Sequence, residues 1–456
     1  MNDAPPTLSP SVLAALRSRV RGTTLVPSDS GYAAARWVWN GAIDRRPSAI
    51  VTCADAEDVS FALRIAADHG LRMTVRGGGH NVAGRSIRDE MLLLDLSRLR
   101  SVAVNRESRI AMVQGGALWR NVDAAAAAEG LATTGGLVSS TGVGGFTLGG
   151  GTGWLMRKHG VACDNLRSAG VVLADGRFVR ASAEEHADLY WGLRGGAGGL
   201  GIVTSFEFQL YPLREVLVGL VIHPAERALQ ALRAFRSFAA AAADEFCGIA
   251  VMANAPPLPF LDPAWHGRPV VIFAVCWCGD IAAGERALAP LRAHGTPLAD
   301  HIGPMGYAQW QQMLDPGAPA GRHYYWKTAN YTALSDSVLE SIAAAAQRLP
   351  TPQSEIHVQH MGGAVARVPA EETAFVHRGA QFFVNLIGAT DEQRQVEGLR
   401  SGIRALHTEI SRDALPGILT NFSDQDDSDD ERQFGRSNAA RLESLRRRYD
   451  PAGTLA

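Results

Sequence analysis

The residues most able to do chemistry in this 456-residue chain lie in the segment RGGGHNVAG at 76–84. Three consecutive glycines have no side chains to pack, but their backbone turns freely and can expose successive N–H groups. Such a concave run of N–H groups is an anion-binding nest that suits a pyrophosphate, and Arg76 could add charge-assisted hydrogen bonds. His80 would then stand at the rim, within reach of a flat ligand. A glycine turn followed by a surface histidine explains the segment equally well.

A second glycine-rich stretch, residues 135–154, contains nine glycines among twenty residues. Because Leu, Val, Phe and Trp are interspersed, it is typical of a chain that lies against a ligand with its backbone. The segment GAGGLG at 196–201 matches the dinucleotide fingerprint G-x-G-x-x-G. That fingerprint must open a helix, whereas residues 202–211 alternate like a strand, so we reject a Rossmann interpretation.

Candidate catalytic side chains lie in the second half of the chain. The segment EIHVQH alternates, which places Glu355, His357 and Gln359 on one face of a strand, either a pocket wall or a solvent-exposed face. His357 is the best histidine candidate for a base, since imidazole exchanges protons near neutral pH. Tyr325, in the run RHYYWK, either stacks on a ring-shaped substrate or belongs to an aromatic core.

The elements that must position these residues indicate two regions. The first contains a helix over 8–20 and an amphipathic helix over 55–70. After Pro212 the glycine runs stop and strands alternate with helices, which indicates a second domain from about residue 214. Near the end, residues 417–422 read as a short strand, and the acidic run at 424–431 reads as a solvated loop.

Composition limits the class of protein. The chain is 46% hydrophobic with a formal net charge of -2, so we expect no nucleic-acid or membrane partner. Five irregularly spaced cysteines predict neither a disulfide framework nor a metal site. The N-terminus lacks a secretory pattern, and no apolar run reaches about 18 residues. The default expectation is a cytoplasmic monomer or homodimer with reduced thiols.

Taken together, the motifs resemble the berberine bridge enzyme-like FAD-linked oxidases of the vanillyl-alcohol oxidase/PCMH superfamily. The bacterial members that the chain resembles include hydroxynicotine oxidases and polyketide-tailoring oxidoreductases. The resemblance covers nearly the whole chain and rests on RGGGHNVAG at 76–84, GLVSSTGVGGFTLGGGTGW at 136–154, KHGVACDN at 158–165, LYWGLRGGAGGLGIVTSFEF at 189–208 and RLESLRRRYDP at 441–451.

The resemblance implies an α+β fold, a two-domain PCMH-type FAD-binding fold. Residues 1–213 would form the first part of the FAD-binding domain. Residues 214–414 would form a substrate domain of antiparallel sheet flanked by helices. Residues 415–456 would return to the FAD domain.

The resemblance also implies FAD, covalently bound through His80 to the flavin 8α carbon. The cysteine that makes a second bond in one subgroup corresponds to Val138, so we expect a single attachment. The expected FAD contacts are Arg76, Gly77, Gly78, Gly79, His80, Asn81, Val82, Gly136, Leu137, Thr141, Gly142, Val143, Gly144, Gly151, Val203 and Asn421.

The function implied is that of an FAD-dependent oxidase. It would remove a hydride from a C–H bond next to O or N of a small or secondary-metabolite substrate and reduce O2 to H2O2. The expected catalytic residues are His357, Tyr325 and Asn421, the last as a hydrogen-bonding partner near the flavin. The family's tyrosine base falls on Leu419, so the base stays open, as does the presence of the family's flavin-contacting tail after Ala456. An FAD-binding protein with redox-neutral or no turnover is the alternative.

Overall fold

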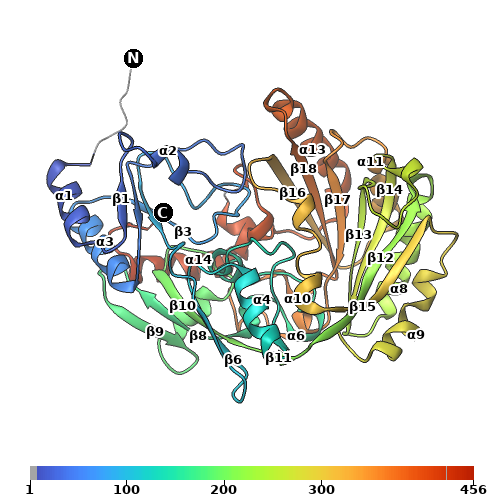
Figure 1. The fold of residues 1–456 in the computed structure, drawn as a ribbon, viewed down its shortest axis with the longest axis horizontal. Helices are drawn as coiled ribbons and strands as arrows, with labels where there is room; N and C mark the ends of the chain where they lie inside the picture. Colours follow the sequence, from blue (N-terminus) through green and yellow to red (C-terminus); the bar gives the residue numbers. More distant parts are fainter. Residues whose placement is uncertain (1–7, 428, 456) are drawn as a thin grey trace.

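The chain folds into two lobes that lie side by side (Figure 1). A cavity lies between them. The computed structural model describes residues 8–427 and 429–455. The first lobe contains most of the N-terminal half and the long C-terminal helix, and the second lobe contains one large antiparallel sheet. The sheets and their covering helices confirm the predicted α+β, two-lobed class of fold.

The first lobe is built on two main sheets and one short strand pair. The smaller sheet has the order β1-β2-β4-β3, in which β4 pairs parallel with both β2 and β3. The larger sheet has the order β5-β6-β10-β8-β9 and is antiparallel throughout. The strands are β1 Thr23–Leu25, β2 Ala49–Thr52, β3 Met73–Arg76, β4 Leu92–Asp95, β5 Val102–Asn105, β6 Ile110–Gln114, β7 Leu131–Ala132, β8 Leu166–Val172, β9 Phe178–Ser182, β10 Ile202–Gln209 and β11 Tyr211–Pro212.

Two predicted helices of this lobe are confirmed, and each begins at a capping side chain. Ser9 accepts a hydrogen bond from the Val12 N–H at the start of the first, and Asp55 accepts one from the Asp58 N–H at the start of the second. The helices of this lobe are α1 Pro10–Arg19, α2 Tyr32–Ala35, α3 Ala56–Asp68, α4 Trp119–Ala128, α5 Val143–Leu148, α6 Met156–His159, α7 Ala187–Leu193 and α14 Asp430–Tyr449.

The second lobe is a seven-stranded antiparallel sheet with the order β15-β12-β14-β13-β17-β18-β16. Its strands are β12 Glu215–Pro224, β13 Phe246–Asn254, β14 Pro269–Trp277, β15 Ala299–Gly306, β16 His323–Tyr331, β17 Glu355–His360 and β18 Phe382–Thr390. Its helices are α8 Ala228–Ala241, α9 Ile281–Arg292, α10 Tyr307–Trp310, α11 Asp336–Ala346, α12 Ala364–Arg367 and α13 Val396–Ile410.

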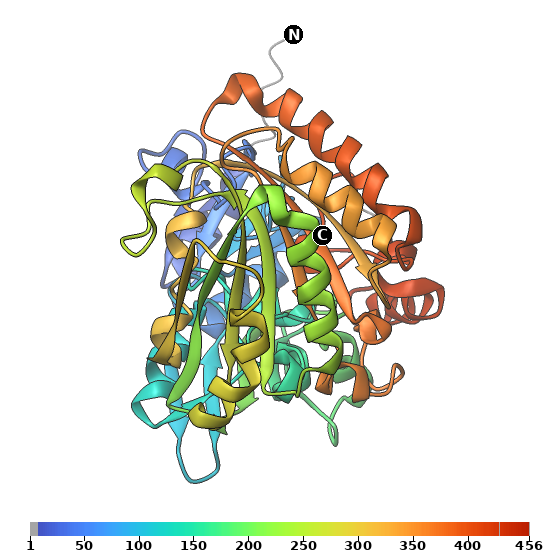
Figure 2. The same ribbon diagram turned by 90° about the vertical axis from the view of Figure 1, so that its right-hand side faces the viewer.

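Four helices, α8, α9, α11 and α13, cover the outer face of this sheet, which Figure 2 views directly. In α13 the buried residues Leu399, Ile403, Leu406 and Ile410 recur at helical spacing, so one apolar face packs on the sheet. Because side chains of a strand alternate between its two faces, the opposite side chains of β16, β17 and β18 point toward the first lobe.

The C-terminal segment corrects two expectations. Residues 417–422 do not form a strand; the chain makes a short 3-10 turn at Thr420–Phe422. The acidic run at 424–431 is solvated only in part: Asp424 and Asp427 are buried, Asp426 is exposed, and residue 428 lies outside the described residues. Lys327 of β16 donates to Asp426 and to Asp427, each at 2.7 Å, and Lys327 is itself buried.

The chain then returns to the first lobe. Leu442 and Leu445 of α14 join the core that contains Leu189 and Trp191 of the first lobe. Leu455 forms a parallel bridge with Met73 of β3, beside the first glycine run. Within the described residues, no helix has both the length and the apolar character that crossing a membrane requires.

Candidate active site

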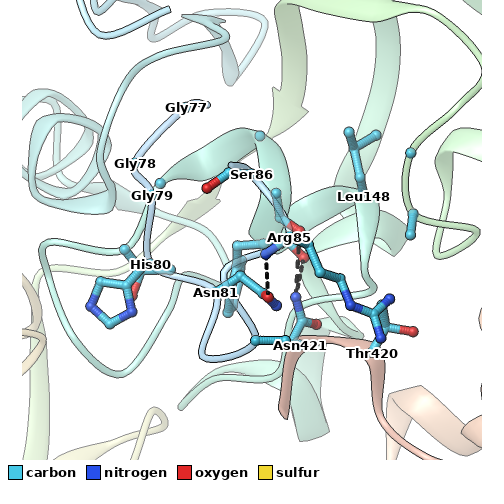
Figure 3. A pocket seen from close by; sticks show the side chains of 18 of the residues that line it. Gly77, Gly78, Gly79, His80, Asn81, Arg85, Ser86, Leu148, Thr420 and Asn421 are labelled. Atoms are coloured by element: carbon cyan, nitrogen blue, oxygen red, sulfur yellow. Dashed lines mark hydrogen bonds between the residues drawn. The ribbon is translucent and has the colours of Figure 1, made fainter. Parts of the chain in front are cut away.

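A cavity of about 1090 Å³ lies between the lobes. One wall is the two glycine stretches, the opposite wall is the inner face of β16, β17 and β18, and the C-terminal segment closes a third side. Figure 3 shows the loop of Gly77, Gly78, Gly79 and His80 with Thr420 and Asn421 across from it. The volume is at the upper end of the range typical of cofactor and ligand sites, about 300–1,000 Å³.

The two glycine stretches meet backbone to backbone. A Cβ atom added to Gly78 would lie 2.5 Å from the amide nitrogen of Gly142, a distance that real Cβ atoms do not show. Gly79 has a φ of 64°, which glycine adopts without strain. Glycine is therefore required in the first stretch for close approach as well as for the turn.

His80 is held by aromatic stacking at the end of this loop. Its ring stacks on the Trp39 indole with 4.2 Å between centroids, and Trp39 stacks on Tyr324 at 3.9 Å. The Nε2 atom of His80 is buried and has no hydrogen-bond partner in the part of the chain that the structure describes. Burial lowers the pKa of His80 to about 4, so its imidazole is neutral at neutral pH.

Arg76 does not reach the cavity, which corrects its predicted role. Its guanidinium group donates to Asp95 at 2.8 Å and to the Trp37 carbonyl at 3.0 Å. Arg76 and Asp95 are register partners on the parallel strands β3 and β4, so the buried cation is neutralised within the sheet. It is not available for phosphate oxygens.

The other predicted cofactor contacts divide into two groups. Those that line the cavity are Gly77, Gly78, Gly79, His80, Asn81, Gly136, Leu137, Thr141, Gly142, Gly144, Val203 and Asn421, together with Val138. Besides Arg76, the residues Val82, Val143 and Gly151 are not on its surface. Val82 packs with Trp39 and Tyr324, Val143 is buried at the start of α5, and the Gly151 N–H donates to Asn421.

Asn421 holds the second glycine stretch in place. Its Oδ1 accepts from the Gly151 N–H at 3.1 Å, and its Nδ2 donates to the Phe146 carbonyl at 3.1 Å. The backbone before the 3-10 turn at Thr420–Phe422 is bonded outside any sheet: the Ile418 N–H donates to the Arg432 carbonyl, and the Gly417 carbonyl accepts from Asn330 Nδ2. Leu419, at the position of the family's tyrosine, is buried in an apolar core and does not line the cavity.

The wall from the second lobe carries side-chain chemistry. Glu355, His357 and Gln359 all line the cavity, as one of the two alternatives for this strand predicted. His357 Nε2 lies 2.6 Å from Glu355 Oε2. Asn385 of β18 is the register partner of His357, and its Oδ1 is buried without a partner.

Tyr325 is not in the cavity, so its predicted catalytic role is corrected. Its hydroxyl donates to Asp426 at 2.7 Å and accepts from Arg404 at 2.9 Å, and its ring belongs to the outer core. Its neighbours Tyr324 and Trp326 line the cavity instead. Side chains alternate along β16, so Tyr325 lies on the opposite face from Tyr324 and Trp326. The sequence RHYYWK does not show which face points into the cavity.

Sequence reasoning missed several residues of the cavity. Arg85 brings positive charge to its C-terminal side, whereas Arg446 and Arg447, also in the lining, are paired with Asp430 and Glu443. Asp424 also lines it, and burial raises the pKa of this carboxyl to about 6. No local pattern marks Arg85 or Asn385, because only the fold brings them to the cavity.

The chemistry of the lining fits a flavin dinucleotide. Buried polar atoms in proteins nearly always have hydrogen-bond partners. Among the described residues, five such atoms that line this cavity have no partner: His80 Nε2, Ser86 Oγ, Thr152 Oγ1, Trp326 Nε1 and Asn385 Oδ1. Together with the backbone cradle and Arg85, they match a long ligand with phosphates at one end and a polar ring at the other.

Comparison with known proteins agrees with this geometry. The FAD binding domain family matches residues 47–182. (R)-6-hydroxynicotine oxidase from Paenarthrobacter nicotinovorans is 32% identical over 289 residues, which span 63% of this chain and 62% of that protein. The crystal structure of 6-hydroxy-D-nicotine oxidase from Arthrobacter nicotinovorans superimposes with a TM-score of 0.83 and 25% identity, covering 95% and 96% of the two chains. That of BBE-like 1 from Physcomitrella patens has a TM-score of 0.88 and 21% identity, covering 97% of each chain.

The fold and the cavity therefore define a flavoprotein of the oxidoreductase type with FAD as its cofactor. The chain is thus similar to berberine bridge enzyme-like FAD-linked oxidoreductases, and residues 47–182 match the FAD binding domain family. The comparisons confirm the predicted fold class and cofactor and agree with the predicted resemblance.

Proposed function

We propose that this protein is an oxidase with FAD bound covalently through His80. It removes a hydride from a C–H bond next to O or N of a small substrate and reduces O2 to H2O2. The observation that carries the proposal is a neutral imidazole with an unpartnered ring nitrogen, held on the wall of the cavity that also contains Glu355 and His357. Relatives named hydroxynicotine oxidase and glucooligosaccharide oxidase support the oxidase class.

FAD, when bound, supplies the hydride acceptor. The backbone of Gly77–Gly79 would hold the phosphates, and Arg85 would balance their charge from the C-terminal side. His80 would supply the ring nitrogen for a bond to the flavin 8α carbon, and O2 would accept the two electrons and two protons that such a linkage releases, giving H2O2. A neutral His80 has the free lone pair that this bond requires.

His357 is proposed as the base for an alcohol substrate. Its Nε2–H donates to Glu355, which leaves Nδ1 to accept the substrate's hydroxyl proton while the hydride leaves. Glu355 then stabilises the imidazolium that forms. A neutral amine substrate needs no base, so dependence on His357 separates the two substrate classes.

Denaturation in acid tests the linkage. The wild-type pellet should stay yellow and that of His80→Ala should be colourless. A colourless wild-type pellet from a protein that binds FAD would remove the covalent bond from the proposal.

Anaerobic mixing with a panel of sugars, alcohols and amines tests turnover. Bleaching of the visible absorbance, followed by one H2O2 per substrate when air is admitted, is the expected result. Product formation without bleaching or O2 uptake would support the redox-neutral alternative. Absence of bleaching across the panel would support an FAD-binding protein without turnover.

A further inference from the structure

The segment Trp39–Gly41 ties the first glycine loop to the sheet of the second lobe. The Trp39 N–H donates to the Gly79 carbonyl at 3.0 Å, and the Trp39 carbonyl accepts from the Gly321 N–H at 2.9 Å. Asn40 Nδ2 donates to the carbonyls of Val82 and Tyr324, and its Oδ1 accepts from the Tyr324 N–H at 2.9 Å. The segment is therefore fixed on both sides of the boundary between the lobes.

The Trp39 side chain is fixed as firmly as its backbone. Its indole is buried, its Nε1–H donates to the Ala318 carbonyl at 3.1 Å, and its ring lies between those of His80 and Tyr324. The interplanar angles are 17° to His80 and 12° to Tyr324. Three rings from three distant parts of the sequence thus form one stack, and all three line the cavity.

We propose that Trp39 is the positioning residue for flavin attachment. Rotation of an imidazole about its last side-chain torsion is broad and poorly restrained. The Trp39 indole removes that freedom by fixing the plane of His80, and Tyr324 supports the indole from the second lobe. Because bond formation depends steeply on the direction of the lone pair, the stack sets how fast and how completely His80 is linked.

This inference rests on the proposed covalent linkage, and three variants test it. Trp39→Leu removes the flat face that contacts His80, while Trp39→Phe keeps a flat ring and removes the bond to Ala318. Trp37→Leu is the matched control, since it makes the same change two residues away on a side chain that is 54% exposed and absent from the cavity. The measurement is the ratio of acid-stable to total bound flavin in purified holoprotein, with thermal unfolding of each variant alongside.

We expect the acid-stable ratio to fall by about tenfold in Trp39→Leu. Trp39→Phe should keep more than about half of it, because the stack is retained. Trp37→Leu should match the wild type. Rescue by phenylalanine distinguishes positioning from a general loss of structure, which would lower total flavin and thermal stability together.

A wild-type ratio in Trp39→Leu would overturn the positioning role while leaving the covalent linkage intact. Absence of acid-stable flavin in the wild type would instead overturn the linkage itself, and the inference with it. If Trp39→Leu does not fold, Tyr324→Leu replaces it, with an expected decrease of about threefold because the support of the indole is lost from one side only. An unchanged ratio in that variant would likewise reject the proposal.

Discussion

The two facing walls of the cavity are built in opposite ways. The wall from the first lobe is backbone: Gly78 and Gly142 pack against each other with no room for a Cβ atom. The wall from the second lobe is side chains, contributed by alternate residues of β16, β17 and β18. One wall offers peptide groups that every residue has, and the other offers chemistry that depends on which residue is present.

This difference assigns the two walls to two tasks. A backbone wall cannot be altered without moving the chain, so it suits a cofactor whose shape is constant. A side-chain wall can exchange one polar residue for another while the sheet stays in place, so it suits a substrate that differs between relatives.

The largest expected effect comes from breaking the backbone wall. In Gly78→Ala the added Cβ would lie 2.5 Å from the Gly142 nitrogen, so the two glycine stretches must separate. We expect loss of nearly all bound FAD, measured by visible absorbance per protein after purification. Gly398→Ala in α13 is the control, since its Cβ would meet nothing within 4 Å. Normal FAD content in Gly78→Ala would show that FAD binding does not need the close contact between Gly78 and Gly142.

The second largest effect is expected from a substitution in the wall of the second lobe, which should lower the reaction rate without loss of FAD. His357→Gln should lower the rate of flavin reduction by an alcohol substrate about 10²- to 10⁴-fold, because the proton acceptor is lost. FAD content should not change, since His357 belongs to the opposite wall. Stopped-flow anaerobic reduction provides the measurement, and Glu355→Gln should give a smaller decrease. An unchanged rate would indicate that no base is needed, as for a neutral amine.

The same contrast explains what could be predicted from the sequence. Glycine runs can be recognised in the sequence, and Gly77–Gly79, His80 and Gly142, which were singled out from them, all line the cavity. A side-chain wall depends on register, which a one-residue shift inverts. Tyr325 was therefore assigned to the cavity although Tyr324 and Trp326 are the inward residues.

Partners distant in sequence were the other source of error. Arg76 was expected to bind phosphate because the pairing of β3 with β4, which brings Asp95 beside it, is not visible locally. The acidic run was expected to be solvated because Lys327 lies about a hundred residues earlier. Asn385 and Arg85 carry no motif at all and become site residues only through the fold.

The third prediction concerns the ion pairs between Lys327 of β16 and the C-terminal segment that lines the cavity. Lys327→Met leaves the buried carboxylate of Asp427 without its cation, which should cost about 3–5 kcal/mol of unfolding free energy. Denaturant unfolding measures the loss, and the double variant Lys327→Met/Asp427→Asn should recover part of it. Arg233→Met, which removes exposed ion pairs to Asp336 and Glu340, should cost at most about 1 kcal/mol. Equal costs for the two single variants would contradict the buried role of Lys327.

The smallest expected effect concerns hydrogen bonds between the two lobes. Gln311 of the second lobe donates to Asp123 of α4 and to the carbonyl of Gly136 in the second glycine stretch. Burial raises the pKa of Asp123 from 3.8 to about 7. Between these values the folded protein binds more protons than the unfolded chain, so unfolding free energy must fall as pH rises through this window. Asp123→Asn should remove this pH dependence. The unfolding free energy of the variant minus that of the wild type should therefore be about 1–4 kcal/mol larger at pH 8 than at pH 4. Denaturant unfolding from pH 4 to pH 8 measures this change, and Asp68→Asn, on an exposed side chain, is the control. Parallel curves for the wild type and Asp123→Asn would show that folding does not raise the pKa of Asp123, and would contradict the prediction.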